Sequence, residues 1–387
     1  MTDIQKENKS GGKVPNLRFP EFTEQWESKP LREVVKINQG LQIAISERST
    51  ENKTGSYFYI TNEFLKAGSG KKYYILNPPQ SVICNEKDIL MTRTGNTGQV
   101  VTNVSGAFHN NFFKVAYPEY IDKIFLYNFL KLNKTQNQIL RFAGTSTIPD
   151  LNHSDFYRII ISFPSNKEQQ KIASFLSLID ERITTQNKII NDLKTLKIAT
   201  AKKIFSGELR FKDDNGNDFS EWEDKKLGDI SIKKSSNISA NTLEENQGNF
   251  KIYGANGLLK EIDFYREEKP YIAIVKDGAG VGRLLLCEGK SSVLGTLDII
   301  KNKEQTDLLF LYYLLETIDF TKFTTGSTIP HIYFKDYSKE IIGLPSFPEQ
   351  TKIANFLSSI DSKIDIENQL LQKLEAQKKY LLQNMFV

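Results

Sequence analysis

The chain has 387 residues, of which 39% are hydrophobic and 25% are charged, and its net charge is +4. This length suggests two to four structural units, and no apolar run approaches the ~18 residues of a membrane helix, which argues against a membrane-spanning protein. Cys84 and Cys287 lie in apolar runs without a CxxC pair. This usage argues against a disulfide framework or a metal site and fits a reducing cytoplasm. The small positive charge is compatible with a polyanionic partner but does not indicate one by itself.

The first 166 residues divide into a polar tail and a β-rich block. Residues 1–16 begin with a polar, glycine-containing stretch, so we expect a disordered tail rather than a signal or transit peptide. Residues 17–166 contain short β-branched or aromatic segments at the spacing of a sandwich or barrel. These segments are 57–60, 89–91, 99–104 and 112–117, and one helix-like stretch follows at 124–141. The pattern predicts an α+β domain.

A long helix is predicted over residues 167–207. No Pro or Gly occurs from Lys167 to Ser206, Pro164 precedes the stretch and Gly207 ends it, which are typical helix start and stop signals. A helix from Lys167 to Lys203 would be about 55 Å long at 1.5 Å per residue. Because an average helix has only ~12 residues, this length favours a spacer over a helix that merely closes a fold.

Residues 208–387 follow the same order as the first half. Strand-like segments occur at 251–253, 271–275, 283–287 and 297–300, and a helix-like stretch follows at 307–320. A second stretch without Gly then runs from 348 to 387. We therefore expect a second α+β domain over 208–347 and a second spacer helix over 348–387.

An internal repeat accounts for this order. The Ser-Thr-Ile-Pro segment at 146–149 recurs 181 residues later at 327–330, and 24 of the 60 positions from 146 to 205 are identical without a gap. Chance would give roughly one identity in twenty, so the chain contains a duplication. Upstream of these segments the two halves share almost nothing except a Leu-Arg-Phe stretch and one tryptophan each. Each copy therefore joins a variable block to a constant block, as expected for two modules that act on different targets.

Apolar residues in the two predicted long helices follow the 4-3-4 spacing of a coiled-coil seam. They are Ile172, Leu176, Ile179 and Ile183 in the first helix and Ile353, Leu357, Ile360 and Ile364 in the second. The next seam position is polar in both, Gln186 and Glu367, which either fixes register and partner choice or marks a broken heptad. Two such helices in one chain would most simply pair antiparallel and separate the two variable blocks.

Three features could be mistaken for catalytic sites. The Asn-Pro-Pro-Gln segment at 77–80 resembles an amino-methyltransferase signature, but Gln80 stands where that signature needs an aromatic residue. The glycine loop at 277–282 is followed by a strand-like run rather than a helix, which favours a hairpin over a cofactor loop. The three histidines have no Cys or His at ligand spacing, and no nucleophile elbow is visible. We therefore expect no catalytic residue and no metal ligand in this chain.

Two glycine loops are candidates for DNA contact. Arg93, Gly95 and Asn96 follow a predicted strand in the first block, and Lys276 and Gly278 follow one in the second. Arginine can grip guanine or phosphate through two hydrogen bonds, and exposed backbone N–H groups can bind phosphate. The alternative is a hairpin turn with a solvated cation.

Small hydroxyl and amide residues form a second group of candidates, since both can contact phosphates or bases. The hydroxyl residues equally suit a capping role, and asparagine is also a common turn residue. These candidates are Thr145, Ser146, Thr147, Ser327, Thr328, Asn110 and Asn256.

The doubled order of variable block, Ser-Thr-Ile-Pro, Glu-Gln-x-Lys-Ile-Ala and long helix resembles the specificity subunits of type I restriction-modification systems over about residues 17–387. The resemblance implies two target-recognition domains, each reading half of a split DNA site, and an antiparallel coiled coil that sets the gap. It also implies a bacterial or archaeal cytoplasmic protein that binds no cofactor itself. Two methyltransferase subunits would carry S-adenosylmethionine and methylate adenine, and nuclease-translocase subunits would use ATP and Mg²⁺.

Two other interpretations stay open at this stage. A free-standing DNA methyltransferase would need an intact catalytic signature and a genuine cofactor loop, and binding of S-adenosylmethionine would identify it. A coiled-coil scaffold without DNA affinity would fail a salt-dependent DNA shift assay in the presence of partner subunits.

Overall fold

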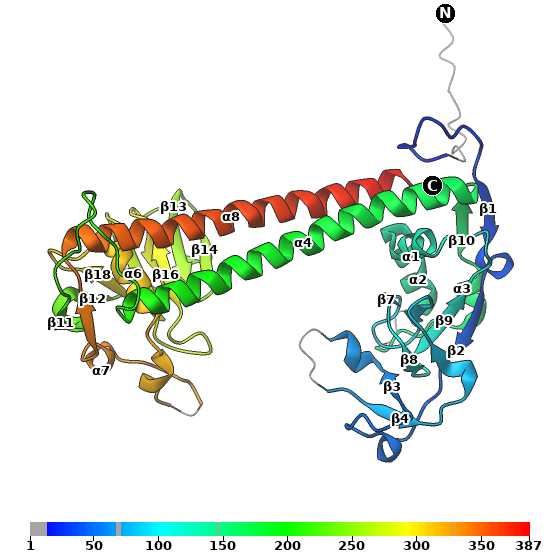
Figure 1. The fold of residues 1–387 in the computed structure, drawn as a ribbon, viewed down its shortest axis with the longest axis horizontal. Helices are drawn as coiled ribbons and strands as arrows, with labels where there is room; N and C mark the ends of the chain where they lie inside the picture. The colour runs from blue at the N-terminus through cyan, green and yellow to red at the C-terminus, as the bar shows by residue number, and fades with distance from the viewer. Residues whose placement is uncertain (1–13, 67–70, 145–146, 327) are drawn as a thin grey trace, which may run out of the picture. The chain divides into compact units, whose positions relative to one another are not determined.

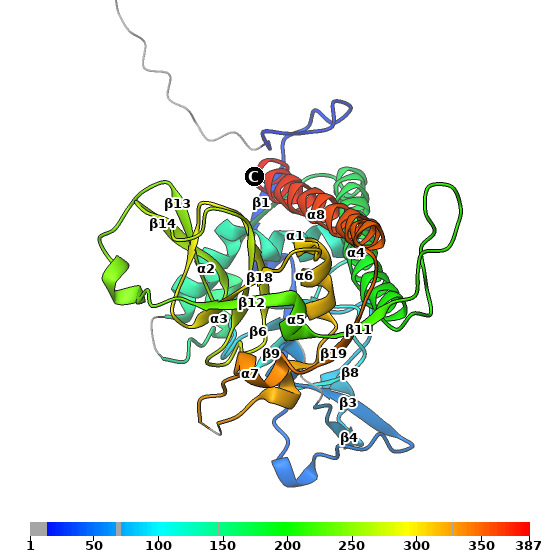
Figure 2. The same cartoon turned by 90° about the vertical axis from the view of Figure 1, so that its left-hand side faces the viewer.

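The computed structural model describes residues 14–66, 71–144, 147–326 and 328–387. The chain divides into two compact units: unit 1 comprises residues 1–186 with 370–387, and unit 2 comprises residues 187–369. Each unit holds one β-rich domain together with parts of the two long helices, α4 (Asn166–Phe205) and α8 (Phe347–Asn384) (Figures 1 and 2). No described helix is long and apolar enough to cross a membrane.

The described part of unit 1 contains two four-stranded sheets and a two-stranded ribbon. Their strand orders are β2-β9-β6-β7, β4-β3-β8-β5 and β1-β10, and the pairs are antiparallel except β3 with β8. β6 is buried along its whole length, which explains its uninterrupted apolar sequence. The strands are β1 (Glu27–Pro30), β2 (Lys36–Gln39), β3 (Ser56–Ile60), β4 (Tyr74–Leu76), β5 (Ile83–Cys84), β6 (Ile89–Thr92), β7 (Val100–Thr102), β8 (Gly106–Phe108), β9 (Phe112–Ala116) and β10 (Ile160–Phe163).

The described part of unit 2 repeats this arrangement with a different sequence. Its strand orders are β12-β18-β15-β16, β14-β13-β17 and β11-β19, and β13 with β17 is again a parallel pair. The strands are β11 (Glu223–Lys226), β12 (Ser231–Ser235), β13 (Phe250–Gly254), β14 (Gly257–Ile262), β15 (Tyr271–Val275), β16 (Leu284–Cys287), β17 (Ser292–Val293), β18 (Leu297–Asn302) and β19 (Ile341–Leu344). The predicted α+β class with two similar domains and two long helices is confirmed.

Two predicted helices differ from the structure. The single helix expected at 124–141 is two helices, because buried Leu132 takes an extended conformation (φ −58°, ψ 138°) between them. Apolar residues continue at helical spacing across this break, so the sequence pattern could not reveal it. The helix expected at 307–320 ends at Glu316, and a short 3-10 turn follows at Phe320–Phe323. The shorter helices are α1 (Lys123–Lys131), α2 (Asn133–Ala143), α3 (His153–Tyr157), α5 (Leu227–Ile230), α6 (Leu308–Glu316) and α7 (Phe334–Tyr337).

The two long helices run antiparallel within each unit. In unit 1, Lys378 of α8 forms an ion pair with Asp180 of α4. In unit 2, Lys197 of α4 contacts Asp361 of α8 at 2.9 Å, and the 181-residue offset exchanges the two pairs. All ten seam residues named above are buried or half-buried. Both helices continue through the polar seam positions 186 and 367, so the alternative of a broken heptad is wrong.

The N-terminal turn of each long helix carries a buried carboxylate that explains part of the repeated motif. Glu168 accepts two hydrogen bonds from the Arg18 guanidinium, each 2.7 Å, and one from Trp26 Nε1 at 3.3 Å. Glu349 accepts the equivalent bonds from Arg210 (2.8 and 3.0 Å) and Trp222 (3.0 Å). Because a buried carboxylate is stable only when it is paired and hydrogen-bonded, these contacts fasten the chain before each domain to its helix.

The following glutamine fastens the domain from another direction. Gln169 accepts from Asp122 N (2.9 Å) and donates to the carbonyls of Pro164 and Tyr120. Gln350 makes the equivalent set with Asp307 N, Pro345 and Gln305. Asp122 and Asp307 are the N-cap residues of α1 and α6. The repeated Glu-Gln pair therefore positions the helix that covers each domain.

The predicted tail at 1–16 lies outside the described residues except for its last three. Leu17 N donates to Asn384 O at 2.8 Å, and the Asn16 side chain contacts that of Asn384. Asn16 therefore belongs to the folded part of unit 1.

We predict that Glu168→Ala lowers the free energy of unfolding of unit 1 by about 3–5 kcal/mol, because the Arg18 charge loses its buried partner. Guanidinium denaturation followed by circular dichroism measures this loss. Glu27→Ala is the matched control, because Glu27 forms an exposed pair with Lys29 and its loss should change stability by no more than about 0.5 kcal/mol. Equal effects of the two substitutions would contradict a role for the buried carboxylate.

Candidate nucleic-acid interface

Two segments that the sequence analysis identified separately lie together in unit 1. One is the loop after β6, which begins at Arg93, and the other is the repeated Ser-Thr-Ile-Pro segment. Thr97 Oγ1 donates to Pro149 O (2.7 Å), and Leu151 N donates to Arg93 O (2.9 Å). Residues 52 positions apart in the sequence thus form one continuous surface.

The equivalent loops of unit 2 are joined in the same way. Gly278 N donates to Pro330 O (2.9 Å), and Ile332 N donates to Lys276 O (3.0 Å). Ile332 is related to Leu151 by the 181-residue offset, so the two domains use the same backbone contact. In both units the candidate cation therefore sits at the junction of a variable loop and the constant Ser-Thr-Ile-Pro segment.

Arg93 is held firmly rather than solvated. Its guanidinium contacts Asp150 Oδ2 at 2.6 Å and Leu151 O at 3.3 Å, and it lies over the Phe113 ring at 5.7 Å. The side chain is only 17% exposed, whereas that of Asp150 is 47% exposed. The alternative of a freely solvated cation is therefore wrong for Arg93. Its planar donor fork has a fixed orientation, and the partner carboxylate offsets its charge.

Lys276 is also paired, but in a more positive setting. Its ammonium contacts Asp298 Oδ1 at 3.3 Å, and the same carboxylate faces Lys233 at 3.8 Å and accepts from Ser235 Oγ at 2.9 Å. Because two lysines share one carboxylate, this cluster retains a net positive charge. The two units thus place different electrostatics at equivalent loops.

The glycine loops adopt conformations that favour glycine. Gly95 has φ +86° and Gly278 has φ +94°, which is the left-handed region. A Cβ on Gly95 would also lie 2.7 Å from Asn62 Nδ2. Gly95 and the adjacent Asn96 are exposed, and Gly278 is half-buried. This geometry leaves the loop backbone of unit 1 accessible to a ligand.

Two asparagine side chains near these loops have unused acceptors. Asn110 Nδ2 donates to Gln42 Oε1 (3.1 Å), and Asn62 Nδ2 donates to Thr94 O (3.1 Å). The Oδ1 atom of each is buried without a hydrogen-bond partner in the described part of the chain. A buried orphan acceptor needs an explanation, and an incoming donor such as a base amino group would satisfy it.

The histidine beside Asn110 contributes no positive charge at neutral pH. Burial, and secondarily the charge of Arg48, lower the pKa of His109 to about 4. Its Nδ1 accepts from Asn111 N at 3.1 Å, which stabilises the turn. His109 therefore has a structural role in positioning Asn110.

The remaining candidates differ in how far the structure describes them. Asn256 lies at the tip of the β13–β14 hairpin, where its Oδ1 accepts from Arg283 Nη1 at 2.8 Å. Thr147 and Thr328 are exposed next to the joined loops. Thr145, Ser146 and Ser327 lie outside the described residues. Whether any candidate touches DNA stays a prediction.

Sequence reasoning missed the residues that hold the candidates in place. Asp150, Asp298 and Asn62 approach Arg93, Lys276 and Gly95 from distant segments, which leaves no periodic trace. Asp150 did leave one signal, because it follows directly on the repeated Ser-Thr-Ile-Pro and is replaced by His331 in the second copy. A difference inside an otherwise constant segment points to a role that differs between the two domains.

The features weighed as catalytic sites have ordinary structural positions. The glycine loop at 277–282 joins β15 and β16, which pair antiparallel, so the predicted hairpin is confirmed. The Asn-Pro-Pro-Gln segment forms an exposed turn after β4, with Asn77 at φ +49°. Among the described residues, no group of three or more His, Cys, Asp or Glu is arranged to hold a metal ion.

Comparisons with known proteins agree with this architecture. The family model "Type I restriction modification DNA specificity domain" matches residues 23–195 and 219–376. The MjaVIII type I restriction enzyme specificity subunit of Methanocaldococcus jannaschii is 28% identical over 403 aligned positions, which cover 95% of this chain and 92% of that protein. The crystal structure of a type I system S subunit from M. genitalium has a TM-score of 0.61 at 20% identity, covering 97% and 99% of the two chains.

A structure determined in work on complex assembly of the type I restriction-modification system has a TM-score of 0.55 at 16% identity, covering 92% and 96% of the two chains. At these identities the structural matches concern the fold, whereas the family match covers the chain in two repeats. The chain belongs to the type I restriction-modification DNA specificity family, whose members are generally non-catalytic recognition subunits that determine DNA sequence specificity.

We predict that Arg93→Ala weakens binding of cognate DNA by about 1–3 kcal/mol in the assembled complex, as expected for a base contact. If Asp150 serves to orient Arg93, Asp150→Ala also weakens binding, and the double variant loses no more than Arg93→Ala alone. Fluorescence anisotropy at several salt concentrations measures both effects, with Lys29→Ala as the exposed control. Lys276→Ala provides the same test in unit 2. Unchanged binding by both the Arg93 and Lys276 variants would show that these loops have only structural roles.

Proposed function

We propose that each β-rich domain reads one half of a bipartite site in double-stranded DNA, and that the paired long helices set the unread gap between the halves. The observation that carries this proposal is the identical backbone junction of the two loops in both units, combined with different side chains around it. Arg93 and Asp150 stand at the junction of unit 1, where Lys276 and His331 stand in unit 2. A constant frame with two unlike surfaces suits recognition of two unlike half-sites.

We further propose that this chain directs catalysis by partner subunits. Two methyltransferase subunits would supply S-adenosylmethionine and methylate adenine in each half-site, and nuclease-translocase subunits would supply ATP-dependent restriction with Mg²⁺. Membership of the specificity family supports this division of work. The shared fold with the structure from work on type I complex assembly also supports it.

Exchange of residues 17–166 for the matching block of a relative should change one half of the methylated sequence and preserve the other half. The reason is that the block contains the whole variable domain of unit 1, while Glu168 and Gln169 stay on the frame. Sequencing that maps methylated adenines in cells expressing the complete system gives the readout.

The incoming block must supply an arginine and a tryptophan at the positions of Arg18 and Trp26, since Glu168 would otherwise lose its partners. The matched control is a chimera that also exchanges the long helix. If both halves of the methylated sequence changed, or neither did, the proposal of two independent readers would be wrong.

Insertion of one heptad into both long helices should lengthen the gap by about three base pairs. Seven residues add about 10.5 Å to a helix, and B-DNA rises ~3.4 Å per base pair. Insertion after Asn187 and after Asn368, which the 181-residue offset relates, preserves the seam pattern in both helices. Methylation mapping then measures the spacing of the modified sites.

The added base pairs also rotate the half-sites by roughly 100°, given 10–10.5 base pairs per turn, so overall activity is expected to fall. Insertion into one helix alone is the control, because it mismatches the seam and should abolish activity. An active double-insertion protein that methylates the original spacing would show that the helices do not set the gap.

A further inference from the structure

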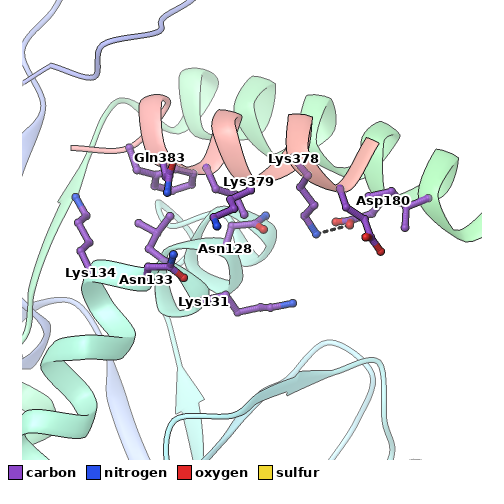
Figure 3. Close-up of a pocket in the computed structure, with 13 residues that line it drawn as sticks. Asn128, Lys131, Asn133, Lys134, Asp180, Lys378, Lys379 and Gln383 are labelled. Atoms are coloured by element: carbon purple, nitrogen blue, oxygen red, sulfur yellow. Dashed lines mark hydrogen bonds and ion pairs between the residues drawn. The ribbon is translucent and has the colours of Figure 1, made fainter. Parts of the chain in front are cut away.

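A lysine-rich pocket lies in unit 1 between α1, α2 and the two long helices (Figure 3). Its volume is about 580 Å³, and four lysines face two carboxylates, Asp180 and Glu375, across it. Apolar side chains complete the lining, namely Leu132, Ile183, Leu382 and Phe386. The lysines are Lys131, Lys134, Lys378 and Lys379.

Only part of this positive charge is matched by the protein itself. Lys378 forms its ion pair with Asp180, as the dashed line in Figure 3 shows. Lys131 donates to the Tyr127 hydroxyl at 3.0 Å, which is a neutral partner. The pocket therefore combines an excess of cations with an apolar lining.

Unit 2 provides an internal reference for this site. Asp122 and Asp307 cap α1 and α6 and accept equivalent glutamine contacts at their backbone N–H groups, which aligns the two helices residue by residue. Both then read Asp-x-x-Phe-Leu-Tyr. In this alignment, Asn128 corresponds to Tyr313 and Lys131 corresponds to Glu316.

These two replacements complete an ion-pair network in unit 2. Lys197, the counterpart of Lys378, donates to Glu316 at 2.8 Å and to Asp361 at 2.9 Å, and it lies 4.9 Å from the centre of the Tyr313 ring. The Tyr313 hydroxyl donates to Asp361 at 2.8 Å. Desolvation acts to lower the pKa of Lys197, but the hydrogen bonds to Glu316 and Asp361 outweigh it and raise that pKa. An aromatic ring and a second carboxylate thus satisfy the lysine in unit 2, and unit 1 has neither.

We propose that the pocket of unit 1 binds an aromatic side chain with a neighbouring carboxylate from a partner polypeptide, supplying the groups that Tyr313 and Glu316 supply in unit 2. The carboxylate would pair with Lys378 and Lys131, and the ring would cover the apolar lining. Within the proposed function, on which this identification of the partner rests, the polypeptide belongs to a subunit of the assembled complex. Since unit 2 satisfies its own lysine, the contact is specific to unit 1.

The apolar lining distinguishes this ligand from a nucleic acid. A phosphodiester would pair with the lysines but would leave Leu132, Leu382 and Phe386 in contact with water. An aromatic acidic segment satisfies both kinds of lining group, as the unit 2 network demonstrates. The pocket is thus complementary in charge and in polarity to a polypeptide.

The first test uses the full-length chain and the blocked dipeptide acetyl-Tyr-Glu-amide, with binding followed by NMR. Acetyl-Tyr-Gln-amide and inorganic phosphate are the comparison probes. We expect the Glu peptide to bind about tenfold more tightly than the Gln peptide, and Lys131→Glu to weaken it by a similar factor. Lys29→Ala should leave binding unchanged. Equal binding of the two peptides, absence of binding, or displacement by phosphate at equal concentration would overturn the proposal, the last in favour of a phosphate site.

The second test transfers the network between the units. Asn128→Tyr combined with Lys131→Glu should fill the pocket of unit 1, raise the melting temperature and abolish peptide binding. Tyr313→Asn combined with Glu316→Lys should open a peptide site in unit 2. If the unit 2 variant does not fold, Lys131→Glu still decides the outcome, because its side chain is exposed. These measurements contain no DNA, so a chain that reads DNA but binds neither peptide would refute this proposal alone.

Discussion

The fold depends on a buried carboxylate at the start of each long helix. Glu168 and Glu349 lie in the protein interior, where a charge is stable only with several well-aligned donors. An arginine and a tryptophan from the segment before each domain provide those donors. The frame therefore imposes a strict requirement on each variable block at its attachment, and few requirements elsewhere. This explains how two domains with almost no common sequence share the same strand order.

The attachment also sets how a domain and its helices move together. Seam residues of the N-terminal half of each long helix belong to a domain core, as Ile172 and Leu176 do in unit 1 and Ile353 and Leu357 do in unit 2. The C-terminal end of the other helix enters the same core, through Phe386 stacked on Phe125 and through Phe205 against Phe310. Because close-packed cores deform little, each domain is rigidly coupled to both helices at its end. A spacer with loosely tethered domains could not define a gap length.

Much of this organisation could be predicted from the sequence, because repeats and heptads are periodic signals. The constant blocks, the seam and the antiparallel helices follow from spacing alone. The break at Leu132 could not be predicted, since apolar residues keep helical spacing on both sides of it. The contact of Arg93 with Asp150 was equally hidden, because two residues 57 positions apart leave no local pattern. The exchange of Tyr313 and Glu316 for Asn128 and Lys131 was concealed by a length difference, since the offset between the halves is 181 residues in the constant blocks but 185 at α1 and α6.

The joined loops show how recognition can diverge without loss of the scaffold. Main-chain atoms make the contact that fixes each loop, with Leu151 N on Arg93 O in unit 1 and Ile332 N on Lys276 O in unit 2. Such a bond does not depend on the side chain, so the cation can change from arginine to lysine while the loop keeps its place. The side chains then differ in what they can distinguish. A guanidinium held by Asp150 presents two donors in a fixed plane, which suits discrimination of a base edge. A lysine that shares Asp298 with Lys233 presents a more diffuse charge, which suits a phosphate. The two halves of a split site can therefore be read by different physical means on one duplicated frame.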